Sequence, residues 1–308
     1  MGEHCLIVRQ YNADMKNGPL AVVGAAVLWG TAGTAGLLVS ADSVALAAAR
    51  LVIGGAALAL VAGAALRRTV SPALLLGAVA VAAYQLCFFA AVSRTGVAIG
   101  TVVAIGSGPV FTGLLSWLLH GRRPGARWAL ATTAAICGCA ALIVGGGDGA
   151  PGAAGGQAAL GVAFALLGGL LYAFYAVTAA RAISGGAESN AVMGVMFGGA
   201  AVIMLPVLVL TGAEWLAEPR SLLAVAYLGL GTTALSYLLY GRGLRTTPVA
   251  TAATLALAEP AVAALLGVVV LREHLGPVSV AGLVLLAIAL VAVAVPERVR
   301  ERALESQP

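Results

Sequence analysis

The chain has 308 residues, of which 61% are hydrophobic and only 9% are charged, and its formal net charge at pH 7 is +5. Soluble globular domains carry about 25% charged residues, so this composition excludes a soluble enzyme, a nucleic-acid-binding protein and a disordered protein. The mean hydropathy of +1.03 instead indicates an integral membrane protein whose helices fill most of the chain.

Charged residues and clusters of glycine and proline divide the chain into ten apolar segments. Each segment has close to the roughly 20 residues that a helix needs to span a bilayer. In chain order, the predicted helices are 19–41, 44–66, 71–92, 96–119, 127–145, 158–180, 190–211, 221–241, 247–271 and 277–295. The runs lack the alternation that is typical of a transmembrane β-barrel. We therefore predict an all-α integral membrane protein with ten transmembrane helices.

The basic residues of the loops predict how the chain is oriented. If the N-terminus is cytoplasmic, the external loops hold only Arg94, Arg220 and Arg272, and the other loop and tail arginines lie inside. Because cytoplasmic loops carry the excess of arginine and lysine, we expect both termini to be cytoplasmic and the protein to reside in the cell (inner) membrane. The first residues are too polar for a signal peptide, and Met15 is an alternative start.

The two halves of the chain resemble each other. At an offset of 151 residues, Pro109 aligns with Pro260, and the run 84–144 aligns without a gap. Five helices per half is an odd number, so the second copy is inverted in the membrane. Such repeats are typical of secondary transporters, whose site lies near the midplane between them; a channel is the alternative. The predicted organisation is a cytoplasmic tail (1–18), a five-helix repeat (19–145), a glycine-rich external linker (146–157), a second five-helix repeat (158–296) and a cytoplasmic tail (297–308).

Five short motifs lie in the predicted helices or directly after them. They are Leu28-Trp29-Gly30, Ala49-Arg50-Leu51, Ser107-Gly108-Pro109-Val110, Ala258-Glu259-Pro260-Ala261 and Leu271-Arg272-Glu273-His274-Leu275. In these motifs the chain resembles the EamA family of the drug/metabolite transporter superfamily, over residues 19–296 in two tandem EamA repeats. The resemblance implies a ten-helix inner-membrane carrier that often exports amino acids or other small metabolites. It also implies a central cavity lined chiefly by helices 1, 3, 4, 6, 8 and 9.

Glu259 lies near the middle of its predicted helix, where a charged side chain costs about 2.5–3.5 kcal/mol on insertion scales. An acid at this depth is expected to face a wet cavity, pair with a cation or be protonated. One hypothesis makes Glu259 a ligand for a substrate amine or a proton carrier. The other makes it a neutral carboxyl that bonds to backbone groups freed by Pro260, which lacks an N–H. Both stay open.

Arg50 is the only basic residue within a predicted helix. Near the outer end of its helix, it is expected to reach the interface or to pair with Asp42; the alternative is a bidentate contact with a substrate carboxylate. Pro109 and Pro260 are expected to loosen their helices, either as hinges or breaks in the helix or as passive kinks. The candidates for coupling or gating are therefore Arg50, Pro109, Glu259 and Pro260.

Aromatic and polar side chains gather on the first, third, sixth and eighth predicted helices. Phenol and indole groups in hydrocarbon need a polar partner or water, which favours an inward position. The candidate substrate-binding residues are Trp29, Tyr84, Gln85, Phe88, Ser107, Tyr172, Tyr175, Tyr237 and Glu259. The alternative for the aromatic residues is the belt at the membrane interface, which we expect for Tyr240, near a helix end. The alternative for Ser107 is a bond to its own helix.

No catalytic signature is present in the sequence, which lacks a His-Glu-x-x-His, a Cys-x-x-Cys and a phosphate-binding loop. We therefore expect no enzyme activity, no cofactor and no metal site, and transport driven by a gradient. The predicted function is secondary active transport of a small polar or amphipathic metabolite, an amino acid or related compound, with export by alternating access. The alternative is a flippase or exporter of a lipid-linked or drug-like amphiphile. Expected partners are a small-molecule substrate and the lipid bilayer but no nucleic acid, in a monomer or homodimer.

Overall fold

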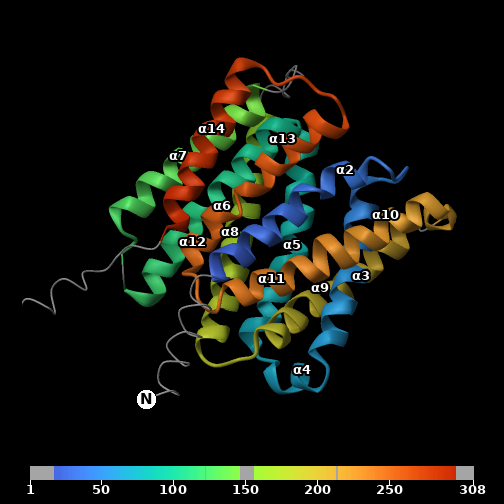
Figure 1. The fold of residues 1–308 in the computed structure, drawn as a ribbon. Helices are drawn as coiled ribbons and strands as arrows, with labels where there is room; N and C mark the ends of the chain where they lie inside the picture. Colours follow the sequence, from blue (N-terminus) through green and yellow to red (C-terminus); the bar gives the residue numbers. More distant parts are fainter. Residues whose placement is uncertain (1–16, 122, 146–155, 213, 296–308) are drawn as a thin grey trace, which may run out of the picture.

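The computed structural model describes residues 17–121, 123–145, 156–212 and 214–295 (Figure 1). Within these ranges, ten helices are long and apolar enough to cross a membrane, and no strand occurs. The fold is therefore the predicted all-α membrane bundle. The predicted C-terminal tail, the predicted N-terminal tail up to residue 16 and most of the predicted linker lie outside the described residues.

Each membrane span lies within a few residues of its predicted position. The ten spans are Asn17–Gly36, which ends in α2 (Ala32–Gly36), Ser43–Ala62 (α3), Pro72–Thr95 (α5), Val97–Leu119 (within α6, Val97–His120), Ala126–Gly145 (α7), Gly156–Ser184 (α8), Ser189–Thr211 (α9), Pro219–Gly243, Val249–Val270 and Pro277–Ala294 (α14). A short helix, α4 (Ala64–Thr69), follows α3, and a single 3₁₀ turn (Glu214–Ala217) precedes the eighth span.

Local sequence signals explain where several helices begin and end. The Asp42 carboxylate accepts the backbone N–H of Val44 at 2.8 Å and so caps α3. Ser71 caps α5, and Pro72 occupies the first helical position, where no N–H is needed. After α6, Gly121 adopts a left-handed conformation with φ of 68°, which glycine reaches without steric cost. These boundaries are set by the residues themselves rather than by the membrane.

The eighth span contains a π-helical turn. It consists of α10 (Pro219–Gly229), the π-helical residues Leu230–Leu235 and α11 (Ser236–Gly243). The hydroxyl groups of Thr232 and Thr233 both donate to the carbonyl of Leu228, at 2.7 and 3.0 Å. Short π-helical turns inside α-helices are frequent at functional sites, and this one lies halfway along its span.

The ninth span is broken in its middle. It consists of α12 (Val249–Leu255), a turn at residues 256–257 and α13 (Ala258–Val270). Pro260 has no N–H to offer the carbonyl of Ala256, which instead accepts the N–H of Glu259 at 3.0 Å. The break therefore places Glu259 in the first turn of α13. By contrast, α6 continues through Pro109.

Helices far apart in the sequence pack as pairs. The α3 helix packs along α9, α5 along α8 and α7 along α14, and Figure 1 shows α7 and α14 side by side at one edge of the bundle. A Cβ atom added to Gly138 would lie only 2.6 Å from the backbone nitrogen of Leu286. Glycine here lets the backbones of α7 and α14 approach closely, as is common inside membranes.

The two ends of the bundle differ in charge. One end, which we call the arginine-rich end, carries Arg67, Arg68, Arg123, Arg127, Arg181, Arg242 and Arg245 in the described part of the chain. The opposite end carries Arg94, Arg220 and Arg272. This asymmetry is the one from which the orientation is predicted.

Candidate functional site

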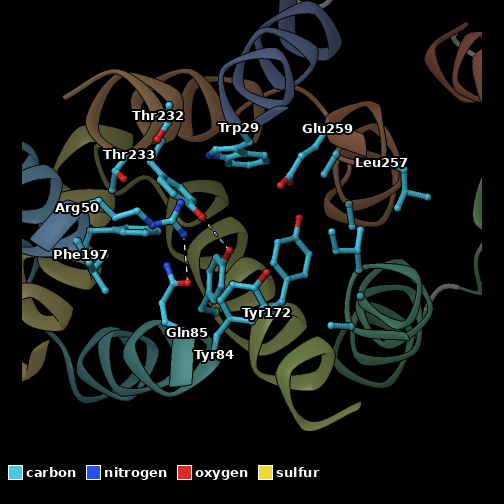
Figure 2. A pocket seen from close by; sticks show the side chains of 18 of the residues that line it. Trp29, Arg50, Tyr84, Gln85, Tyr172, Phe197, Thr232, Thr233, Leu257 and Glu259 are labelled. Carbon is cyan, nitrogen blue, oxygen red and sulfur yellow. Dashed lines mark hydrogen bonds between the residues drawn. The ribbon is translucent and has the colours of Figure 1, made fainter. Parts of the chain in front are cut away.

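A cavity of about 80 Å³ lies at mid-depth between the two halves of the chain (Figure 2). Its lining residues are Trp29, Arg50, Leu51, Tyr84, Gln85, Ala104, Ile105, Gly108, Pro109, Tyr172, Tyr175, Phe197, Thr232, Thr233, Tyr237, Ala253, Ala256, Leu257 and Glu259. Among the described residues, every span except the fifth and tenth contributes to this central cavity. The second and seventh spans, absent from the set that the family resemblance implies, supply Arg50 and Phe197.

An arginine and a glutamate side chain face the central cavity. Figure 2 shows Arg50 and Glu259 on opposite sides, with the Glu259 carboxylate directed inward. The Arg50 guanidinium donates from Nη2 to Oε1 of Gln85 at 3.2 Å. Asp42, the partner expected for Arg50, instead caps α3, and Arg50 lines the cavity rather than reaching the interface. Within the described ranges, no hydrogen bond or ion pair to the Glu259 carboxylate occurs, so this acid is available to a ligand.

Trp29 forms one wall of the central cavity. Its indole N–H donates to the Ser236 hydroxyl at 2.9 Å, just after the π-helical turn. Its ring lies 5.1 Å from that of Tyr237 and 5.5 Å from that of Tyr240. Tyr240 is fully buried, so its expected place at the membrane interface is wrong. The reason is that its ring packs on Trp29, deep inside the bundle.

Tyrosine hydroxyl groups are paired beside the central cavity. Tyr175 and Tyr237 approach to 3.2 Å between their hydroxyl oxygens, and Tyr172 and Tyr240 to 3.3 Å. These contacts join α8 to α11 and give each of the four phenol groups the polar partner that it needs in an apolar environment. Phe197 completes this wall, with its ring centroid 3.8 Å from that of Tyr237. The rings therefore form a fixed aromatic surface.

The structure brings most of the candidate residues together. Seven candidate substrate-binding residues line the central cavity, namely Trp29, Tyr84, Gln85, Tyr172, Tyr175, Tyr237 and Glu259, and so do Arg50 and Pro109. Phe88, Ser107 and Pro260 are not among the lining residues. Phe88 packs against Phe89, with ring centroids 5.6 Å apart. The Ser107 hydroxyl donates to the Ala104 carbonyl at 3.2 Å, and Pro260 is buried beside the helix break.

Three lining residues with distinctive side chains are missing from the candidates derived from sequence. Phe197 is the only aromatic residue of α9, and Thr232 and Thr233 are adjacent hydroxyl residues inside an apolar span. An isolated aromatic residue and a polar pair within such spans are the signals that favour an inward position.

Comparison with known proteins agrees with this architecture. The model of the EamA-like transporter family matches the chain twice, over residues 16–144 and 159–295. The chain belongs to the EamA-like transporter family. It is 36% identical over 290 residues to the "Uncharacterized transporter YwfM" of Bacillus subtilis (strain 168), a match that covers 92% of this chain and 96% of that protein. As a member of this family, the chain is a multi-pass membrane transporter.

One solved crystal structure shares the fold of this EamA-like chain. It superposes with a TM-score of 0.78 at 20% sequence identity, and the match covers 92% of this chain and 99% of that chain. At this identity the likeness concerns the fold alone, so substrate and mechanism are argued from the cavity of the present chain.

Proposed function

We propose that the chain is a secondary active transporter whose substrate carries both an amine and a carboxylate, such as an amino acid or a related small metabolite. The observation that carries this proposal is the position of Arg50 and Glu259 on opposite walls of one cavity at mid-depth. Arginine binds a carboxylate with two parallel hydrogen bonds, and a glutamate attracts an amine. The aromatic faces between them suit an apolar side chain or the cationic group.

Transport through this site requires the helices to move. Ligand pockets measure about 300–1,000 Å³, whereas the central cavity has a volume of about 80 Å³. We infer that it enlarges toward one side of the membrane at a time, as alternating access demands. The broken ninth span and the π-helical turn are the points at which the backbone bonds are already irregular. Pro260 and Pro109, on facing repeats, are our candidates for gating.

We infer the orientation and the energy source from the sequence. We propose that the arginine-rich end faces the cytoplasm, that both termini lie there and that the membrane is the inner membrane. Export is the direction that the family resemblance favours. The chain carries no nucleotide-binding motif, so an ion or substrate gradient drives transport, with Glu259 as the candidate proton carrier. We assign the chain no catalytic reaction and no cofactor.

A second candidate substrate is a drug-like or lipid-linked amphiphile. The aromatic side chains of the cavity wall favour it, because such molecules offer large apolar surfaces. Two unpaired charges of opposite sign on facing walls favour the zwitterionic substrate instead, since an amphiphile with one charge leaves the other charge without a partner.

Reconstituted vesicles test the proposal. Uptake of radiolabelled amino acids is compared with that of their amine and carboxylate analogues, for wild type, Arg50→Gln and Glu259→Gln. We expect wild type to prefer the zwitterion, and each variant to lose about tenfold or more in affinity for it, because a charge-assisted hydrogen bond is lost. Arg220→Gln and Glu214→Gln, which alter charges away from the cavity, serve as matched controls. Equal uptake of zwitterion and analogues by all proteins contradicts the proposal.

A further inference from the structure

A second cavity, of about 840 Å³, lies at the arginine-rich end and shares no lining residue with the central cavity. It lies where the starts of the first span, α7 and α12 meet the ends of α8 and α14. The lining residues in the described part of the chain include Arg127 and Arg181 but no aspartate or glutamate. The cavity is thus large enough for a small-molecule ligand and positively charged.

Two buried hydrogen-bonding groups of this cavity have no partner within the described structure. Thr247 is only 4% exposed, and its hydroxyl group makes no hydrogen bond. The indole N–H of Trp128 is also buried without a partner, and both residues line the cavity. Buried polar groups are nearly always bonded, and an unmade bond costs free energy. A ligand that offers hydrogen-bond acceptors removes this cost.

The two arginines are placed differently. Arg127 donates from Nη2 to the carbonyl oxygens of Ala292 and Val295, at 2.6 and 2.8 Å, at the end of α14. These bonds fix its position and use two of the five N–H donors of a guanidinium. Arg181, in the last turn of α8, is exposed and has no acidic partner in the described part of the chain. One arginine is therefore held in place, and the other is free to close on a ligand.

We propose that this cavity is a second binding site, which takes a phosphate or carboxylate group carried on a partly apolar body. Two positive charges, two unpaired donors and the lack of a carboxylate in the described lining all favour an anion. A soluble metabolite and the headgroup of an anionic lipid share this chemistry. The site differs from the central cavity, where a carboxylate and a guanidinium face each other.

Thermal unfolding of the full chain in phosphatidylcholine nanodiscs tests the site, with phenyl phosphate as the probe and benzyl alcohol as its neutral match. We expect phenyl phosphate, but not benzyl alcohol, to raise Tm by mass action. Arg181→Gln and Thr247→Val should each weaken the apparent affinity about tenfold. Thr247→Val removes only an unpaired hydroxyl group, so its Tm without probe should not fall. Arg242→Gln, at the same end but outside the cavity, should bind like wild type.

Nanodiscs that contain phosphatidylglycerol distinguish the two sources of the anion. If a lipid headgroup occupies the site, these nanodiscs raise the Tm of wild type but not of Arg181→Gln, and phenyl phosphate adds little. If the ligand is soluble, the probe keeps its full effect in both lipids. The proposal is overturned by equal probe affinity in wild type, Arg181→Gln and Thr247→Val, by equal stabilisation with benzyl alcohol, or by the absence of stabilisation by both the probe and the anionic lipid.

Discussion

The indole N–H of Trp29 donates to the hydroxyl oxygen of Ser236 at 2.9 Å, across 207 residues of sequence. The Ser236 hydroxyl in turn donates to the Thr232 carbonyl at 2.6 Å, inside the π-helical turn. These two bonds join the first span to the π-helical turn of the eighth span. They also orient the Trp29 indole, which lines the central cavity. A substitution at Trp29 is therefore expected to alter both the lining of the central cavity and the hydrogen bonding of the π-helical turn.

Trp29→Phe removes the hydrogen bond but keeps an aromatic ring. We expect the free energy of unfolding to fall by about 1 kcal/mol, the typical net worth of one hydrogen bond, and transport to fall further than the loss of folded protein explains. Thermal unfolding and vesicle uptake measure the two effects. Ser236→Ala, which removes the acceptor and leaves the indole in place, should act in the same direction; normal transport by both variants argues against a role for this bond.

The wider set of cavity residues gives a second prediction. Trp29, Tyr84, Gln85, Tyr172 and Tyr237 line the central cavity, and we expect substitutions of at least three of them to lower transport more than Tm. Gln85→Leu is the most direct case, since it removes the hydrogen-bond partner of Arg50. If all five variants lose stability and transport in proportion, these residues serve packing and the substrate binds elsewhere.

Gly30 is predicted to be indispensable for the contact between the first span and α13. A Cβ atom there would lie 2.6 Å from the Cβ of Val262 and 2.7 Å from the backbone oxygen of Glu259. Gly30→Ala should therefore lower the free energy of unfolding by about 1–3 kcal/mol, as overpacking does. Gly33→Ala is the matched control, because nothing lies within 4 Å of its added Cβ. Equal Tm values for the two variants contradict this contact.

Membrane spans could be predicted from the sequence because hydropathy and length alone define them. The break in the ninth span could also be anticipated, since Pro260 removes a backbone donor. Pro109 removes one too, yet α6 continues through it. Whether a helix breaks at a proline depends on the helices packed around it and not on the proline alone.

The lining of the central cavity could be predicted only in part. Phe197 is missing from the candidates and Phe88 lies outside the cavity, because a helix that is apolar on all faces carries little signal about its rotation. The position of Tyr240 near a helix end predicts an interfacial place, but its partner Tyr172 comes from another helix. Contacts of this kind, between helices far apart in the chain, cannot be predicted from the residues near Tyr240 in the sequence.

Membrane orientation is tested by labelling single cysteines in a cysteine-free background. A cysteine at position 214, beyond the end of α9, should react with an impermeant reagent added from outside, and so should one at position 148, which lies outside the described residues. A cysteine at position 123, at the arginine-rich end, should react only after the membrane is permeabilised, because basic loops are retained in the cytoplasm. Labelling at position 123 from outside overturns the orientation.

The most direct test of the central claim, that substrate and coupling proton meet at Glu259 in the central cavity, is transport by Glu259→Gln under an imposed pH difference. The amide keeps the shape of the side chain but cannot release a proton. We predict that this variant folds with the Tm of wild type, while its substrate uptake into vesicles is lost or no longer responds to the pH difference. Uptake by Glu259→Gln with the full pH dependence of wild type would contradict the claim.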